Sequence, residues 1–224
     1  DFDRLVELDV NPLLVNSQGV VALDARIRIS IKSEVKTNRL AIHPYPHDLE
    51  EKITLASGKT YELRPVRPED EPALIENFNQ LTKEEIRFRF FNAIKTMSHP
   101  MAARFSQIDY DREMALVITD PRTQKNWKLY AVVRLISEAF EPRAEFSLIV
   151  NHVVGRQGLG TLLLKRIIHY AESRGLKEVY GSVLAENKVM LDLCKRAGFT
   201  MQSQHNEPGV VTVKLLLNRE ASNS

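Results

Sequence analysis

Three glycines fall within six residues of this chain, where a predicted strand gives way to a predicted helix. They are Gly155, Gly158 and Gly160, which follow an extended run over residues 146–150 and precede an apolar-periodic segment over residues 159–173. Glycine adopts positive φ readily, and its missing Cβ lets a ligand approach the main chain closely. The first N–H groups of a helix lack partners within the helix and carry partial positive charge. Strand, glycine loop and helix start therefore predict an anion site suited to a pyrophosphate.

The spacing of these glycines excludes two common phosphate-binding loops. A dinucleotide fold has the order G-x-G-x-x-G, whereas this chain has G-x-x-G-x-G. A P-loop places a lysine directly after its last glycine, and here Thr161 stands in that position. The loop therefore needs another explanation.

The pattern resembles the acyl-CoA pyrophosphate loop of the GNAT acetyltransferase superfamily, usually [QR]-x-x-G-x-[GA], although Gly155 stands where Gln or Arg is usual. A second segment, N-K-V-M-L-D-L-C-K-R-A-G-F over residues 187–199, resembles the family's pattern N-x-x-[AM]-[IL]-x-L-[YC]-x-[KR]-x-G-F. The two motifs follow one another in the family's order, joined by a helix and a strand. Together they favour this family over a plain α/β core with glycines at its turns.

The resemblance implies an α/β (α+β) GNAT fold, with a mixed, mostly antiparallel sheet flanked by helices. Periodicity gives the order β-α-α-β-β-β-α-β-α-β-β with one extra short helix, which matches that fold. Early helices are expected to open at Pro68, at Thr82 as N-cap, and at Ser98. The strands are predicted over residues 60–66, 113–119, 127–137, 143–150, 178–184, 199–204 and 210–217.

The first 31 residues resemble the C-terminal end of the ATP-grasp domain of ADP-forming acyl-CoA synthetases. The resemblance lies in E-L-D-V-N-P-L over residues 7–13 and V-A-L-D-A over residues 21–25, in two strand-like runs around a turn at residues 16–19. It implies that Asn11 and Asp24 correspond to metal ligands of that family. The nucleotide pocket is absent, so we expect no metal site and no ATP turnover. Alternatively, the hairpin packs on the catalytic domain and Asn11 serves only the turn.

The predicted domains are therefore an ATP-grasp-like remnant over residues 1–31, a Pro-rich linker over residues 32–58 and a GNAT domain over residues 59–220. The 224 residues are 43% hydrophobic and 27% charged, with a net charge of +2, so charge does not argue for a nucleic-acid partner. We expect no membrane association, because no apolar run has the length of a membrane span. The single cysteine fits a reducing cytoplasm.

The resemblance implies transfer of an acetyl group from acetyl-CoA to an amine. A lysine ammonium has a reference pKa of roughly 10.4 and must lose a proton before it attacks a thioester. Glu145 is the predicted general base, because protein-acetylating members of the family carry a glutamate in the strand before the loop. Strand alternation places it with Ser147 and Ile149, and we expect apolar neighbours to desolvate it. Alternatively, Glu145 pairs with an arginine of the sheet.

Cys194 stands where many relatives have a tyrosine that protonates the departing thiolate. We expect it to line the site, either as this acid or as a buried residue that fills space. The predicted acetyl-CoA contacts are the backbone of Leu148, Ile149 and Val150 for the pantetheine arm, the loop residues Arg156, Gln157, Gly158, Leu159, Gly160 and Thr161, and the side chain of Asn187. Asn187 also suits the N-cap of the next helix, and the two roles are compatible.

The acceptor is predicted to be a protein lysine. The run R-F-R-F-F over residues 87–91 resembles that of bacterial protein acetyltransferases fused to synthetase-like domains. An acyl-CoA synthetase is one candidate protein substrate. The sequence is also compatible with two other functions. One is acetylation of a small amine in an acidic pocket formed by Glu138, Glu141 and Glu145, and the other is a non-catalytic acyl-CoA sensor.

Overall fold

The computed structural model describes residues 5–10, 12–17, 19–29, 44–55, 58–92, 94–121, 127–138, 141–155, 157–203 and 207–217. The chain divides into two compact units, residues 1–41 and 42–224. No helix among the described residues is both long enough and apolar enough to cross a membrane.

The smaller unit consists of two short pairs of antiparallel strands. Strand β1 (Leu5–Val10) pairs with β4 (Ala25–Ile29), and β2 (Leu13–Asn16) pairs with β3 (Gly19–Ala22). The backbone N–H of Gly19 donates to Asn16 Oδ1 at 3.1 Å, which confirms the predicted turn. Each long strand that we predicted is divided in two. The first is interrupted at Pro12, which has no N–H to donate to a neighbouring strand, and the second at residues 23 and 24. Asn11 lies outside the described residues, and Asp24 is within 3.7 Å of Arg26.

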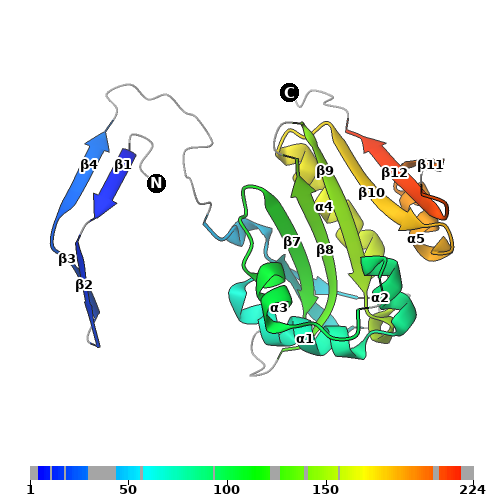
Figure 1. The fold of residues 1–224 in the computed structure, drawn as a ribbon, viewed down its shortest axis with the longest axis horizontal. Helices are drawn as coiled ribbons and strands as arrows, with labels where there is room; N and C mark the ends of the chain where they lie inside the picture. Colours follow the sequence, from blue (N-terminus) through cyan, green and yellow to red (C-terminus); the bar gives the residue numbers. More distant parts are fainter. Residues whose placement is uncertain are drawn as a thin grey trace. The chain divides into compact units, whose positions relative to one another are not determined.

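The larger unit is built on an eight-stranded sheet of order β11-β12-β10-β9-β8-β7-β6-β5 (Figure 1). All neighbouring strands are antiparallel except β9 and β10, which are parallel. This confirms the predicted mixed, mostly antiparallel sheet. The strands are β5 (Glu51–Thr54), β6 (Thr60–Pro65), β7 (Glu113–Thr119), β8 (Leu129–Ser137), β9 (Arg143–Val150), β10 (Glu178–Leu184), β11 (Thr200–Ser203) and β12 (Val210–Leu216).

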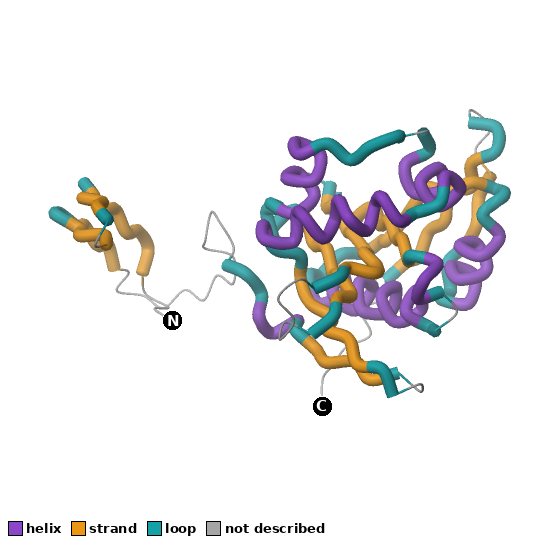
Figure 2. Tube along the Cα trace, turned by 90° about the horizontal axis from the view of Figure 1, so that it is seen from below, coloured by secondary structure: helices purple, strands orange, loops and turns teal. Residues whose placement is uncertain are grey.

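Helices cover both faces of this sheet, as Figure 2 shows. They are α1 (Glu71–Gln80), α2 (Lys83–Phe90), α3 (His99–Ser106), α4 (Leu159–Ser173) and α5 (Lys188–Arg196), with short 3-10 turns η1 (His47–Leu49), η2 (Pro68–Asp70) and η3 (His152–Val154). Thr82 Oγ1 accepts from the N–H of Glu85 at 3.1 Å, and Ser98 Oγ accepts from that of Met101 at 3.4 Å. The predicted starts of α2 and α3 are thereby confirmed.

Strand alternation sorts the core into two layers. On β7, Leu116 and Ile118 belong to the same buried cluster as Leu163 of α4. Val117 lies between them in sequence and belongs to a second buried cluster with Leu74 of α1. Because alternate residues of a strand point to opposite faces, α1 and α4 cover opposite faces of the sheet.

The sheet splits between its two parallel strands. Strands β9 and β10 pair through Arg143↔Glu178, Ala144↔Val179 and Glu145↔Tyr180. The next position of β10 is Gly181, where an added Cβ would lie 2.8 Å from the ring of Phe146. Beyond this point β9 continues to pair with β8 but no longer with β10. The backbone edge of β9 that faces β10 is therefore open over its last residues.

The predicted linker over residues 32–58 is wrong at its end. Strand β5 lies within that range and pairs with β6, through Glu51↔Leu63 and Ile53↔Tyr61. Ile53 is buried in the core, and this apolar anchor outweighs the extended Pro-rich composition that precedes it. Residues 30–43 lie outside the described part of the chain.

Candidate active site

A groove of about 570 Å³ runs between the open edge of β9 and helix α5. Its floor is formed by Leu148, Ile149 and Val150, and its far wall by Asn187, Met190 and Leu193. A smaller cavity shares Phe88, Arg89, Leu148, Asn187 and Met190 with this groove and extends to Glu145 and Ser182. The two spaces therefore form one path from the glycine loop to the fork between β9 and β10.

The glycine loop closes the outer end of the groove, where Gly155, Gly158, Leu159, Gly160 and Thr161 line it. Gly158 has φ +81°, a left-handed conformation that L side chains rarely adopt, and it precedes the first residue of α4. The free N–H groups of the first turn of α4 therefore lie at the groove.

Gly160 keeps this groove open. A Cβ at Gly160 would lie 3.6 Å from side-chain carbons of both Val150 and Leu193. Any larger side chain would fill the space between β9 and α5. The glycine is therefore required by the groove and not by a strained backbone.

Glu145 lies at the inner end of this path, and it lines the smaller cavity. It shares a face of β9 with Ser147, while Phe146 and Leu148 are buried on the opposite face. The expected desolvation of Glu145 is wrong, because the residue is exposed at the point where the strands separate. The alternative ion pairs are not formed: Arg143 pairs with Glu138 and Glu141, and Arg134 with Glu113.

Cys194 does not line the groove, and this expectation is wrong. Its side chain is fully buried in the core cluster that includes Leu163 and Phe199. Burial raises the pKa of the Cys194 thiol to about 11. On α5 the groove is lined by Val189, Met190, Leu193 and Arg196, and helical rotation turns Cys194 inward from them. The thiol therefore has no access to the groove.

Asn187 is the N-cap of α5, which confirms one of its two predicted roles. Its Oδ1 accepts a hydrogen bond from the N–H of Met190 at 3.1 Å. The residue also lines both the groove and the smaller cavity. The cap uses only the Oδ1 atom, so the predicted contact with the cofactor remains compatible with it.

Two contacts hold α2 beside the groove. The carboxylate of Glu85 accepts from the N–H of Thr82 at 2.7 Å and from the N–H of His152 at 2.8 Å. It thereby caps α2 and joins it to the turn η3 after β9. At the other side of the groove, Arg87 of α2 forms an ion pair with Glu186, which directly precedes Asn187. Helix α2 is thus bonded both to the turn that follows β9 and to the residue that precedes the N-cap of α5.

Arg89 of α2 places a guanidinium between these walls. It lines the groove, the smaller cavity and a third small space under α1 and α3. Burial lowers the pKa of Arg89 to about 10, and the nearby carboxylate of Glu145 opposes that shift. The guanidinium remains protonated at neutral pH and sets a positive charge close to the exposed carboxylate.

The predicted contact residues divide into three groups. Leu148, Ile149, Val150, Gly158, Leu159, Gly160, Thr161 and Asn187 line the groove. Gln157 instead lines a neighbouring cavity, and Arg156 lies outside the described residues. Sequence reasoning missed Glu85 and His152, which line the groove and are 67 residues apart, so no local pattern joins them. Met190 and Leu193 were recoverable from the apolar spacing of the α5 motif.

The comparisons with known proteins agree with this geometry. Residues 61–200 match the family model described as acetyltransferase (GNAT) domain. The chain is 26% identical over 164 residues to an acetyltransferase of Pseudomonas aeruginosa, a match that covers 73% of this chain and 88% of the relative.

Two solved structures extend the match to three dimensions. The crystal structure of the GNAT domain of S. lividans PAT is 25% identical, covers 78% of this chain and 100% of that chain, and has a TM-score of 0.69. RimL, a ribosomal L7/L12 alpha-N-protein acetyltransferase solved in complex with coenzyme A, is 15% identical. It covers 75% of this chain and 98% of its own, with a TM-score of 0.60, and shows likeness of fold alone.

The fold and the groove define an enzyme of the acyltransferase class. The chain belongs to the GNAT acetyltransferase family, whose acyl donor is acetyl-CoA. The residues present suit that donor. The space at Gly160, which a larger side chain would fill, and the open edge of β9 suit a narrow, extended amide chain. The N–H groups at the start of α4 suit a pyrophosphate.

Proposed function

We propose that this enzyme acetylates lysine ε-amines of protein substrates by direct attack in a ternary complex. The observation that carries the proposal is the exposed carboxylate of Glu145 at the inner end of the groove. A lysine side chain is long and flexible, and it can reach such a position from outside the fold. Glu145 would accept the proton of the attacking amine, directly or through one water.

Acetyl-CoA supplies the activated acetyl thioester. Of the chain's own groups, the N–H groups at Leu159, Gly160 and Thr161 would hold the pyrophosphate, and the backbone of β9 would hold the extended arm. Asn187 would orient the arm from the opposite wall. Cys194 has no part in this proposal, since it is buried outside the groove. Positioning of the two reactants thus replaces covalent catalysis.

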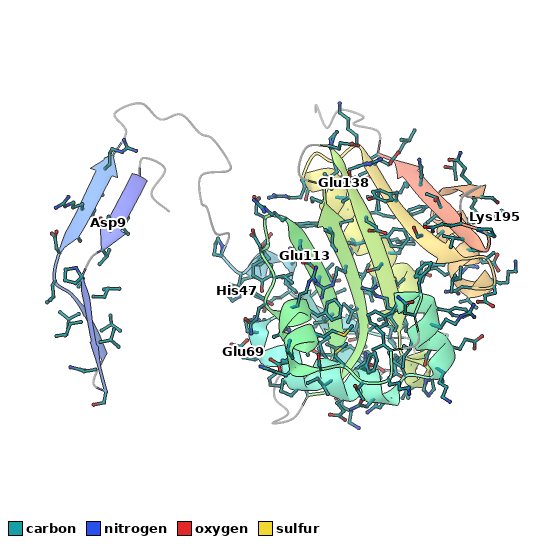
Figure 3. The ribbon with its side chains drawn as sticks, in the orientation of Figure 1. Asp9, His47, Glu69, Glu113, Glu138 and Lys195 are labelled. Atoms are coloured by element: carbon teal, nitrogen blue, oxygen red, sulfur yellow. The ribbon has the colours of Figure 1, made fainter. Side chains whose placement is uncertain are left out.

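The small-amine alternative requires an acidic acceptor pocket, and two of its three acids are otherwise engaged. Glu138, labelled in Figure 3, accepts from Tyr180 Oη at 2.6 Å and pairs with Arg143 at 2.9 Å. Glu141 also pairs with Arg143 at 2.9 Å. Glu145 is the one of the three that lines the cavity. This arrangement favours a large acceptor that brings its own recognition surface.

We propose that the N-terminal unit is the end of an ATP-grasp domain, which the predicted linker before the β5 strand joins to the GNAT domain. Its exposed side chains support this reading, because Leu14, Val15, Val20 and Val21 are each more than half exposed. Apolar strands of this kind are normally covered by a larger domain. We propose a cytoplasmic location, because a chain with a single cysteine suits a reducing compartment.

The acceptor is tested by incubating the chain with radiolabelled acetyl-CoA and a desalted or undesalted cell lysate. The proposal is supported if the radiolabel stays with protein after desalting and is found on lysine residues. Label confined to the small-molecule fraction contradicts it and favours the small-amine alternative. Absence of label in either fraction, from a chain that binds acetyl-CoA, favours the sensor.

A further inference from the structure

A second cavity, of about 520 Å³, adjoins the loop between β9 and α4. It is separate from the groove but shares Val154 with it. Its walls come from the β5–β6 hairpin, the end of α1, the start of β8 and the loop itself. The lining residues are Leu55, Lys59, Tyr61, Gln80, Lys128, Tyr130, Val153, Val154 and Gln157.

The lining carries positive charge. Lys59 and Lys128 contribute two ammonium groups, and none of the described residues that line the cavity is acidic. The nearby carboxylate of Asp120 is engaged, since it accepts from Tyr130 Oη at 3.1 Å and from the N–H of Lys128 at 3.2 Å. Glu76 is not among the lining residues, and it accepts from the amide of Gln80 at 3.3 Å. The lining itself is therefore cationic, and the two nearby carboxylates keep their charge while they hold hydrogen bonds to neutral groups.

Two tyrosines fix one of these cations in place. The Nζ of Lys59 lies 4.8 Å from the ring centroid of Tyr61 and 5.1 Å from that of Tyr130. The two rings meet edge to face at 5.4 Å, and both are buried. A cation held over two aromatic faces is ordered before any ligand arrives, which lowers the entropic cost of binding.

The wall of this cavity also has an unsatisfied polar group. The hydroxyl of Tyr61 is buried and has no hydrogen-bond partner among the described residues. Buried hydroxyls are normally paired, so this hydroxyl still has the capacity to form a hydrogen bond with a further partner.

We propose that this cavity is a phosphate-monoester site, with Lys59 and Lys128 as its cationic ligands. A phosphate monoester carries nearly two negative charges at neutral pH and forms short, charge-assisted hydrogen bonds with ammonium groups. Its position beside the glycine loop gives it two sources of ligand: the 3′-phosphate of coenzyme A itself, or a separate phosphorylated small molecule. The proposal does not depend on the nature of the acceptor.

The test compares the dissociation constants of coenzyme A and 3′-dephospho-coenzyme A by calorimetry. The protein is used as the wild type, as Lys59→Gln/Lys128→Gln, and as the control Lys52→Gln/Lys177→Gln. The control removes two charges from exposed lysines outside the cavity. A further variant, Lys59→Arg/Lys128→Arg, keeps the charge. Binding of inorganic phosphate is then measured by NMR on protein saturated with dephospho-coenzyme A, so that the glycine loop is already filled.

If the cofactor is the source, the wild type prefers coenzyme A by about tenfold, the gain expected of charge-assisted hydrogen bonds. That ratio falls to about one in the Gln variant and persists in the control and in the Arg variant. If a separate ligand is the source, the wild-type ratio is about one, and inorganic phosphate binds the wild type but not the Gln variant. The proposal is overturned if the Gln substitutions change neither the ratio nor phosphate binding.

Discussion

Glu145 and Tyr180 form the last paired position between β9 and β10, and the sheet splits directly beyond them. The hydroxyl of Tyr180 is already engaged in a hydrogen bond, which it donates to Glu138 at 2.6 Å. Burial raises the pKa of Tyr180, so that the phenol stays protonated at neutral pH. Glu145 is thus the side chain of this pair that is available as a proton acceptor, and it stands where the groove ends.

Gly158 and Gly160 are predicted to respond differently to substitution by alanine. Gly160 has helical geometry and room for a Cβ, so Gly160→Ala should raise the free energy of unfolding by up to roughly 0.5–1 kcal/mol. The added methyl group stands in the groove, so the affinity for acetyl-CoA should fall. Gly158→Ala should instead lower stability by about 1–2 kcal/mol, because of its positive φ.

Chemical denaturation and calorimetry on both glycine variants separate these effects. Unchanged acetyl-CoA affinity in a folded Gly160→Val protein, which carries the larger side chain, would contradict the assignment of the groove.

Helix α2 is predicted to depend on Glu85 for its position. Glu85→Ala removes the cap at Thr82 and the bond to the N–H of His152, and it should lower the free energy of unfolding by about 1–2 kcal/mol. The KM for acetyl-CoA should rise, since α2 lines the groove. Glu84→Ala, at the exposed neighbouring position, is the matched control and should change neither quantity much.

Cys194 is predicted to be structural. Cys194→Ala should retain acetyl transfer while losing about 1–2 kcal/mol of stability, from the small cavity that the substitution leaves. The native thiol should resist a thiol reagent at pH 8 and react once the protein is unfolded. A rate loss of a hundredfold or more in the folded variant would restore Cys194 as the acid.

The same residue gives a pH dependence with a definite sign. Because the folded state holds the Cys194 proton more tightly, with a pKa of about 11, it gains stability from this group below the thiol's unfolded pKa of roughly 8.5. That contribution is lost as the pH rises from about 8.5 to 11. The unfolding free energy of the wild type should therefore fall more steeply with pH over this range than that of Cys194→Ala. Parallel curves would show that burial does not hold the proton.

The N-terminal unit is predicted to be dispensable for cofactor binding. A variant lacking residues 1–31 should bind acetyl-CoA as the full chain does, because every residue that lines the groove lies beyond Gly58. It should also need no ATP for transfer. A soluble deletion variant that no longer binds acetyl-CoA would place the unit within the catalytic domain.

Local signals in the sequence predicted much of the fold. Strands β7, β9 and β10 and helix α4 have the predicted bounds, because each has a clear period and a clear punctuating residue. The strand β5 was missed, since four residues carry a single buried apolar side chain, Ile53. Strand periods give the face on which a residue lies, but not where neighbouring strands part. The exposure of Glu145 therefore could not be derived from its apolar neighbours in sequence.

In the site, too, local sequence patterns predicted some features, whereas others depend on tertiary packing. Positions on the loop and on β9 follow from a motif and a strand period, and they line the groove. Cys194 was placed by a motif position, but its helical rotation relative to Leu193 decides its environment, and it is buried. The bond from His152 to Glu85 depends on tertiary packing, and no short-range pattern encodes it.

The central claim is that Glu145 acts as the general base toward a protein lysine. The most direct measurement is the rate of acetyl transfer to a protein acceptor at pH 7 and saturating acetyl-CoA, in the wild type and in Glu145→Gln. Glu141→Gln, an exposed glutamate outside the cavity, is the matched control. The account predicts unchanged acetyl-CoA affinity and a rate reduced about 10²–10⁴-fold in Glu145→Gln alone. The deficit should shrink toward pH 10, where more of the lysine is already deprotonated. A rate for Glu145→Gln within a few-fold of the wild type at pH 7 would contradict the account.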